Sequence, residues 1–131
     1  MSKGFSLIEL LLVMAIMAIL STLMLPNLLG AQDKARESGV RAVAHAIQLA
    51  LESYYVDHGV YPSGSNLGVA ELYEILAIEG QLTKKPKNPY TGRAYDAADA
   101  QGQVLYSLGS SGYSLKAYGR SLDKLIYEGG V

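Results

Sequence analysis

The hydrophobic pattern of the chain begins with one long apolar run that a single ionisable side chain interrupts. From Phe5 to Leu25 that side chain is Glu9. The run has 21 residues, which as a helix extends about 31 Å and can cross a bilayer. A carboxylate at the centre of a spanning helix costs roughly 2.5–3.5 kcal/mol, and somewhat less toward an end. Glu9 is therefore expected to be functional, and Lys3 is the only local cation.

Beyond this run the pattern becomes that of an amphipathic helix. Pro26 removes one backbone donor and Gly30 weakens the helix again, so we expect a kink or local melting there. Gly59 is a good helix stop. The pattern predicts one helix from Phe5 to about His58. Its second half carries an apolar stripe in steps of three and four residues, made of Val40, Val43, Ala44, Ile47, Leu51 and Tyr54.

The rest of the chain predicts a short helix followed by short strands. After a loop at Val60–Asn66, the segment Leu67–Ile78 favours a helix, with Ser65 or Asn66 as a possible cap. The linker Lys84–Gly92 contains two prolines. Four strand-like runs follow it: Arg93–Ala97, Gln103–Leu108, Tyr113–Tyr118 and Ser121–Tyr127. The expected fold class is α+β: a long N-terminal helix, with a membrane-spanning first half, packed against a small antiparallel β-sheet head.

Composition narrows the functions open to the chain. Its 131 residues leave room for one domain besides the apolar helix. There is no Cys, which excludes disulfides, thiolate metal sites and Cys nucleophiles. The formal net charge is -1, which does not suggest a strongly basic nucleic-acid binder. Ten Tyr, one Phe and no Trp suit a half-buried surface where rings pack and hydroxyls stay wet.

The N-terminal residues resemble the leader of type IV prepilins, in the segment Lys3-Gly4-Phe5-Ser6-Leu7-Ile8-Glu9-Leu10. The resemblance implies that a dedicated membrane peptidase cuts between Gly4 and Phe5 and methylates the new N-terminal Phe5. It also implies that Glu9 is the assembly carboxylate, forming a charge pair with the amine of Phe5.

The resemblance extends to the order of the elements, which is that of pilins and pseudopilins. It implies that the helix loosens inside a filament at Pro26 and Gly30. It divides the chain into a leader peptide at 1–4, an apolar transmembrane and assembly helix at 5–29, and a globular head at 30–131. Many pilins close their C-terminal region with a disulfide, whereas this cysteine-free chain must close its fold by packing alone.

The function implied is that of a structural subunit, not an enzyme, which polymerises into an extracellular type IV pilus. Its implied partners are copies of itself, the prepilin peptidase, and an inner-membrane assembly platform with its ATPase motor. The precursor would be a single-pass membrane protein. The alternatives are a major pseudopilin of a type II secretion system and a competence (DNA-uptake) or adhesive binding pilin, in which an exposed basic loop contacts a ligand. No cofactor is expected.

Two simpler interpretations of the N-terminus remain. A secretory signal also has a basic start and an apolar core, but here the run is long, carries Glu9 and lacks a clean Ala-x-Ala site. A plain single-span anchor explains the length of Phe5–Leu25 and leaves Glu9 unexplained.

Side chains elsewhere that could carry chemistry have simpler interpretations. His45 and His58 do not have metal-ligand spacing and are expected at the surface or as a cap. The basic cluster Lys84, Lys85, Lys87 and Arg93 is expected to be a solvated loop. Tyr54, Tyr55 and Tyr61 are expected to pack between helix and sheet rather than to form an electron path.

A calcium site is the remaining possibility, because major pseudopilins carry an acidic C-terminal calcium loop. Such a site needs several oxygen ligands gathered on one short loop. The acidic residues of the C-terminal region are scattered along the sequence, at Asp96, Asp99, Asp123 and Glu128. We therefore expect no metal site, which favours the pilus subunit over the pseudopilin.

Overall fold

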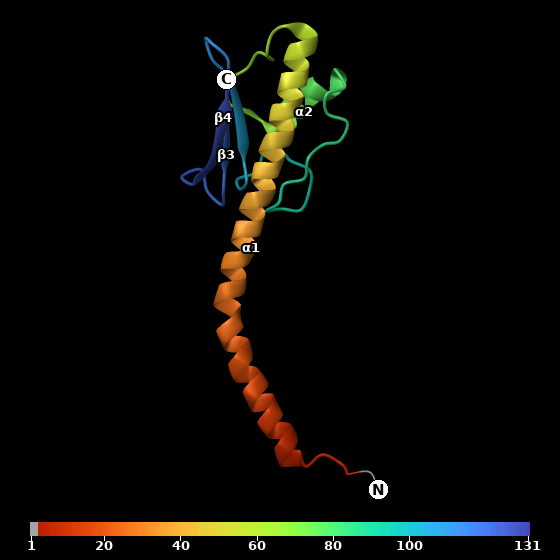
Figure 1. Ribbon diagram of the computed structural model, residues 1–131, viewed down its shortest axis with the longest axis vertical. Helices are drawn as coiled ribbons and strands as arrows, with labels where there is room; N and C mark the ends of the chain where they lie inside the picture. Colours follow the sequence, from red (N-terminus) through yellow and green to blue (C-terminus); the bar gives the residue numbers. More distant parts are fainter. Residues whose placement is uncertain (1–2) are drawn as a thin grey trace. The chain divides into compact units, whose positions relative to one another are not determined.

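The computed structural model describes residues 3–131, and so Met1 and Ser2 of the expected leader lie outside the described residues. The chain divides into two compact units, Met1–Asp33 and Lys34–Val131, which are described separately below. Figure 1 shows the long helix α1, which belongs to both units, and the small elements of the second unit.

Helix α1 spans Leu7–His58 and therefore begins two residues later than expected. It ends where the pattern predicts, and Gly59 follows with a φ of +73°. The backbone is helical at Pro26 and Gly30. The loosening expected at these two positions therefore remains a prediction for the assembled state.

The second unit has a hydrophobic core between α1, the short helix α2 (Val69–Ile78) and a sheet. The α1 stripe supplies Val40, Ala44, Ile47 and Leu51, each between 0% and 2% exposed. Val43 and Tyr54, also predicted to lie on this stripe, are partly buried against the core. The predicted stripe is therefore confirmed.

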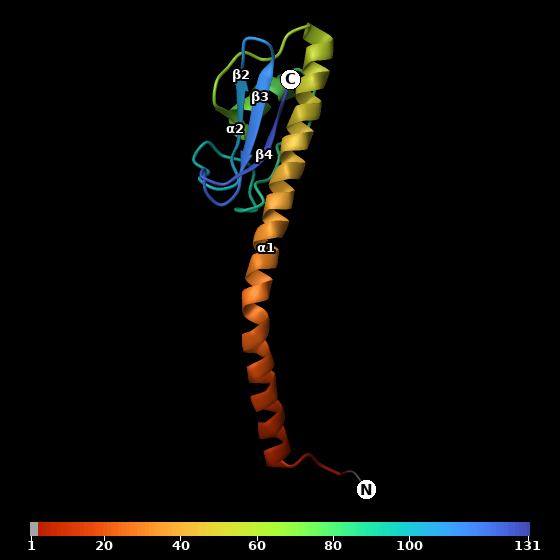
Figure 2. The ribbon, with the colours of Figure 1, turned by 60° about the vertical axis from the view of Figure 1, so that its left-hand side comes forward.

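The sheet has four antiparallel strands in the order β1-β2-β3-β4. Its strands are β1 (Leu67–Gly68), β2 (Val104–Leu108), β3 (Tyr113–Tyr118) and β4 (Leu125–Gly130). In β3 the buried residues Tyr113, Leu115 and Ala117 alternate with partly exposed ones, as the sequence predicts. Figure 2, turned by 60°, shows β2, β3 and β4 side by side near the second half of α1. The predicted α+β class is confirmed.

Several elements of the head differ from the prediction. Leu67 is not the start of a helix, because it pairs with Tyr106 and forms the edge strand β1. The N-cap of α2 is Gly68, whose backbone N–H donates to the Glu71 carboxylate at 3.0 Å, rather than Ser65 or Asn66. The strand predicted at Arg93–Ala97 is wrong, because pairing there is limited to one isolated bridge between Lys87 and Ala94.

The last strand is displaced toward the C-terminus relative to the predicted Ser121–Tyr127. Lys124 N–H donates to the Ser121 carbonyl at 3.1 Å, and Gly119 N–H donates to the Lys124 carbonyl at 2.9 Å. These bonds use Ser121–Lys124 as a turn, and so strand pairing starts only at Leu125.

Candidate functional site

The residues of the expected cleavage site lie in an open segment before α1. Lys3–Ser6 has no helix or strand and is exposed. A Cβ added to Gly4 would meet no atom within 4 Å, and Phe5 is 84% exposed. The peptide bond between Gly4 and Phe5 is therefore accessible to an enzyme that binds extended backbone.

Glu9 lies in the first turn of α1, where it caps the helix. Its Oε2 accepts the Ser6 backbone N–H at 3.2 Å. A carboxylate here also complements the positive end of the helix dipole. Among the described residues it forms no ion pair within the chain, so a cation for Glu9 has to come from outside α1 or from the N-terminus created by cleavage.

The first unit exposes its apolar side chains on every side. Every residue from Lys3 to Gln32 is exposed. The helix has the length and hydropathy of a membrane span, by composition alone, and none of its most apolar window is buried. Such a surface needs lipid or another apolar molecule to cover it. The hydroxyls of Ser21 and Thr22 suit that setting, because each donates to a carbonyl of the same helix at 2.7 Å.

The second half of α1 has an uncharged outer face opposite the core. Ala35, Ala42, Leu49 and Val56 recur every seven residues and are all exposed, with Leu49 at 72% and Val56 at 82%. Ser38, Ala46 and Ser53 lie on the same face by helical spacing. This second apolar surface extends the assembly candidate beyond the membrane span.

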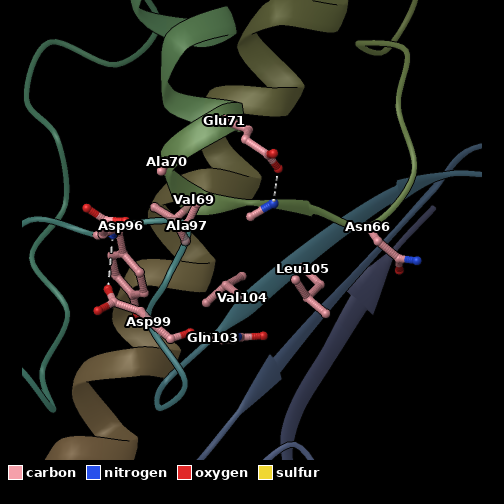
Figure 3. Close-up of a pocket in the computed structure, with 12 residues that line it drawn as sticks. Asn66, Val69, Ala70, Glu71, Asp96, Ala97, Asp99, Gln103, Val104 and Leu105 are labelled. Atoms are coloured by element: carbon pink, nitrogen blue, oxygen red, sulfur yellow. Dashed lines mark hydrogen bonds between the residues drawn. The ribbon is translucent and has the colours of Figure 1, made fainter.

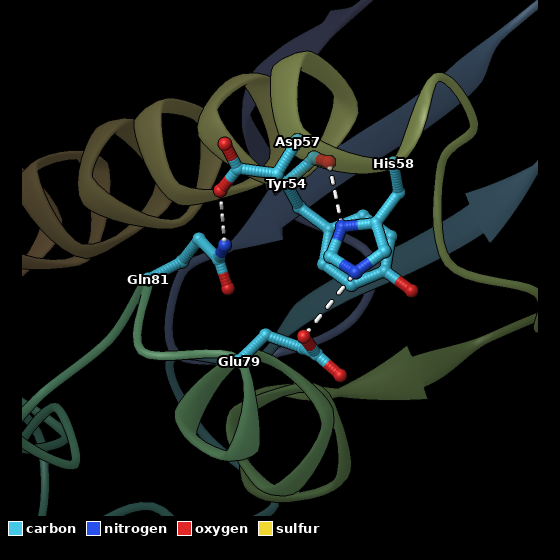
Figure 4. Close-up of polar contacts among 5 residues, drawn as sticks. All are labelled: Tyr54, Asp57, His58, Glu79 and Gln81. Carbon is cyan, nitrogen blue, oxygen red and sulfur yellow. Dashed lines mark hydrogen bonds and ion pairs between the residues drawn. The ribbon is translucent and has the colours of Figure 1, made fainter.

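The two histidines make polar and ring contacts within the head. His45 packs edge-on against Tyr127, with ring centroids 4.9 Å apart. His58 stacks on Tyr54, its Nδ1 donates to the Tyr54 carbonyl at 3.0 Å, and its Nε2 lies 3.2 Å from Glu79 (Figure 4). His58 thus joins the end of α1 to the end of α2.

The tyrosines pack between helix and sheet around one carboxylate. Tyr61 and Tyr113 donate to the two oxygens of Glu52, at 3.1 Å and 2.9 Å. Burial, and next the hydrogen bond to Glu52, raises the pKa of both phenols. The rings of Tyr55, Tyr61 and Tyr113 are in contact, with centroids 4.6 Å and 4.7 Å apart. These contacts support the packing interpretation.

The linker between α2 and the sheet is held by Asn88, a residue to which sequence reasoning assigned no individual role. Its side chain is fully buried and donates to the carbonyl of Gln101 at 2.8 Å and to the carboxylate of Asp99 at 3.1 Å. It also accepts the Tyr90 N–H at 2.9 Å, the two-residue spacing of an Asx turn. The Asn88-Pro89 dipeptide is the signal that could have identified it.

Glu37 is a second residue to which sequence reasoning assigned no individual role. It is 9% exposed and forms an ion pair with Lys124. Its position three residues before Val40 places it on the buried stripe, which was the available signal.

The acidic residues of the C-terminal region do not gather at a single site. Asp96 and Asp99 share one loop beside a cavity of about 220 Å³ near the start of α2 (Figure 3). Asp99 accepts the Asp96 N–H at 3.0 Å, whereas Glu128 pairs with Lys116 at 3.5 Å. Within residues 3–131 no three His, Asp or Glu side chains converge as metal ligands would.

Comparison with known proteins identifies the N-terminal segment and relatives of the chain. Residues 1–25 match the prokaryotic N-terminal methylation motif. The chain is 31% identical over 121 residues to the type II secretion system core protein G of Klebsiella michiganensis, covering 84% of both chains. It is 44% identical over 62 residues to the type IV wide pilus major component PilA4 of Thermus thermophilus, covering 47% of each.

A third relative is the type IV major pilin protein PilE1 of Neisseria gonorrhoeae, 37% identical over 70 residues, which cover 53% of this chain and 33% of the relative. No solved structure matches. The first-listed relatives align over both units and the pilins mainly over one part of the chain. The chain therefore belongs to the family of type IV pilins and type II secretion core proteins G, and it is a structural, pilus-like subunit that is processed by a prepilin peptidase and self-assembles.

Proposed function

We propose that this chain is the subunit of an extracellular type IV pilus. It is held in the membrane by the apolar part of α1 until an inner-membrane platform and its ATPase motor add it to the filament. The observation that carries the proposal is the segment 3–32: its apolar helix is exposed, and its single carboxylate, Glu9, forms no ion pair among the described residues.

Processing prepares the charge pair. Cleavage between Gly4 and Phe5 removes Lys3 and creates a cationic amine at Phe5, which is then methylated. That amine lies four residues before Glu9 in sequence. When helices bundle and exclude water, the amine of one subunit pairs with Glu9 of a neighbour. A buried pair adds little net stability, but one partner left alone costs about 3–5 kcal/mol. The pair therefore selects the register of the bundle.

Cohesion comes from the apolar surfaces. The side chains between Leu7 and Leu29 pass from lipid into contact with other copies, and dispersion and close packing hold them there. The outer face of Ala35, Ala42, Leu49 and Val56 allows copies to approach α1 beyond the membrane span. The loosening at Pro26 and Gly30 adapts the helix between these two zones.

A second candidate is the pseudopilus of a type II secretion system. It is favoured by one observation, the alignment with core proteins G over 84% of both chains. Both functions use the same Glu9 chemistry, and so direct imaging of long shed filaments distinguishes a pilus from a short pseudopilus confined to the cell envelope.

The test of assembly is the Glu9→Leu variant, with cleavage and filament yield measured together. Mass spectrometry should find a methylated Phe5 as the N-terminus of both wild type and variant, because the cleavage site is unchanged. The variant should stay in the membrane and yield few sheared filaments, because the Phe5 amine would be buried without a counter-charge. Glu9→Asp, which keeps the charge and shortens its reach, should assemble in part. Wild-type filament yield from Glu9→Leu would refute the charge-pair mechanism.

A further inference from the structure

The charges of the head are separated along its length. No Lys or Arg occurs between Arg41 and Lys84, and this segment contains five acidic residues: Glu52, Asp57, Glu71, Glu74 and Glu79. Cations flank the segment on both sides in sequence. The fold decides whether the flanking cations come together.

Contacts within the head gather those cations at the end where residue 34 lies. The loop carrying Lys87 and Arg93 is fixed on the first turns of α1 in this unit, because Pro89 lies against Gly39 (a Cβ there would be 2.8 Å from Cγ of Pro89) and Arg36 lies over the Tyr90 ring at 5.8 Å. The turn Ser121–Lys124 is held at the same end of the head, because Lys124 forms an ion pair with Glu37 on α1. We call the set Lys34, Arg36, Lys87, Arg93 and Lys124 the basic end.

The acidic side chains of the basic end are mostly engaged by protein groups. Glu37 pairs with Lys124, Asp96 accepts the Ala98 N–H at 3.0 Å, and Asp99 accepts Asn88. Lys34, Lys87 and Arg93 are exposed. Arg41, which donates to the Ile126 carbonyl, and Arg120, in the turn that ends at Lys124, bring the cations here to seven. They outnumber the five carboxylates of Asp33, Glu37, Asp96, Asp99 and Asp123, and so this end presents net positive charge to its surroundings.

The opposite end of the head is acidic. Asp57 and Glu79 lie together where α1 and α2 terminate, joined through Gln81 and His58 (Figure 4). Both carboxylates are exposed, and Glu79 has 42% of its side chain accessible. Within residues 3–131 no Lys or Arg ion pair reaches either of them. We call Asp57 and Glu79 the acidic end.

The two ends cannot neutralise each other inside one molecule. Lys34 and Asp57 lie on the same helix, 23 residues and thus about 35 Å apart. Charges are screened beyond about 8 Å at physiological ionic strength. In Figures 1 and 2 the loop that carries Lys87 and Arg93 lies at the end of the head away from the turn after His58. Charge complementarity on this scale therefore requires another molecule.

We infer that the basic end of one subunit docks on the acidic end of a second copy of the same chain, so that heads stack from end to end along the filament axis. The inference rests on the proposed function. A contact between two different patches of identical chains is heterologous. Such contacts generate rings where the rotation closes and open helical filaments where it does not, rather than two-fold dimers. The end-to-end contact therefore sets which heads meet, while the apolar helices supply cohesion.

The experiment uses the full chain in a host that makes filaments from the wild-type chain. One variant reverses the basic end, Lys87→Glu with Arg93→Glu. The fold contacts of these residues are backbone ones, a bridge at Lys87 and the Arg93 carbonyl bound by Asn88 N–H at 2.8 Å, so the head should stay folded. A second variant reverses the acidic end, Asp57→Lys with Glu79→Lys. The control exchanges an ion pair within the sheet, Lys116→Glu with Glu128→Lys.

Each reversed variant alone should yield at least about tenfold fewer sheared filaments, because like charges then face each other. Co-expression of the two variants should restore filaments that contain both chains, because the acidic end of one variant again meets the basic end of the other. The control should assemble at the wild-type level. Since Asp57 and Glu79 also contact Gln81 and His58, Asp57→Asn with Glu79→Gln is included, and it should give an intermediate yield with the head folded.

The inference is overturned if either reversed variant assembles normally, or if the two folded variants do not rescue each other. It is also overturned if only the basic-end reversal matters and that variant alone loses binding to phosphatidylglycerol vesicles, because the partner would then be an anionic lipid surface. If the wild-type chain makes no filament in any host, the proposed function fails, and that result is separate from the charge-reversal outcomes.

Discussion

Two of the carboxylates on helix α1, those of Glu9 and Glu37, lie in contrasting surroundings. Glu37 is 9% exposed and has a cation, Lys124, brought from 87 residues away by the fold of the head. Glu9 lies in the segment 3–32, in which every residue is exposed, and it accepts the Ser6 N–H three residues away. The apolar side chains differ in the same way: Leu51 is fully buried within the chain, whereas Leu11 is 58% exposed.

The contrast teaches where each region completes its structure. The head closes its core and pairs its buried charge within one chain, as an independently stable domain must. The first unit leaves its apolar surface and its carboxylate for other molecules to cover, which is what an assembly element requires. The following predictions test this division, from the largest expected effect to the smallest.

Alkaline pH should separate the two regions most clearly. All ten tyrosines lie after residue 34. Burial raises the pKa of Tyr106 to about 12, and burial also raises the pKa of Tyr61, Tyr95 and Tyr113 above 10. Above pH 10 the unfolded chain releases phenolic protons that the folded head retains, so the free energy of unfolding falls as pH rises from 10 to 12.

The measurement is circular dichroism of the full chain in detergent micelles as pH is raised. The near-ultraviolet tyrosine signal should be lost between pH 10 and 12, while the far-ultraviolet spectrum keeps the helix of the tyrosine-free first unit. A head that stays folded at pH 12 would contradict the contribution of these phenols, and simultaneous loss of all helix would contradict the independence of the units.

Truncation of one leucine in each region is the next test. Leu51→Ala should lower the free energy of unfolding of the head by about 2–5 kcal/mol, because it removes fully buried atoms and leaves a cavity. Leu11→Ala should leave head stability unchanged and lower filament yield instead, because this side chain meets its neighbours only after assembly. Denaturant unfolding and sheared-filament counts are measured for both variants. The division between the two regions would be wrong if Leu11→Ala destabilised the head, or if Leu51→Ala lowered filament yield while leaving head stability unchanged.

Replacement of Glu37 should affect the head alone. Glu37→Gln removes a charged hydrogen bond to Lys124, whose side chain is 60% exposed and can turn to water. The expected cost is about 1–2 kcal/mol of head stability, with cleavage and filament yield unchanged. This outcome contrasts with Glu9→Leu, for which filaments are lost and head stability is retained. Loss of filaments from Glu37→Gln with a folded head would place this carboxylate in assembly as well.

Calcium should have the smallest effect. The carboxylates of Asp96 and Asp99 accept hydrogen bonds from protein groups, and Glu128 pairs with Lys116. The head should therefore melt at the same temperature in calcium and in chelator. A ligand specific for the folded state would add RT ln(1 + [L]/Kd), about 2.7 kcal/mol at 100 times its Kd. A clear upward shift would favour the secretion pseudopilin.

Local sequence patterns correctly predicted the elements whose buried face follows the period of a single helix or a single strand. The α1 stripe from Val40 to Leu51 and the alternation of Tyr113, Leu115 and Ala117 are both recovered in the structure. Prediction failed where the pairing partner of a segment decides whether that segment forms a strand. Leu67 is a strand residue because Tyr106 lies opposite it, whereas pairing of Arg93–Ala97 does not extend beyond the single bridge between Ala94 and Lys87.

By itself, the sequence determined the cleavage motif, the apolar helix with Glu9, and the α+β order of the elements, because each is written in neighbouring residues and their spacing. Only the tertiary structure decided that Lys124 neutralises Glu37 and that Asn88 holds the linker. It also decided that Lys87 and Arg93 join the cations near residue 34. These are contacts between residues distant in sequence, which no local period encodes, because burial and hydrogen bonding are satisfied only when the whole chain packs.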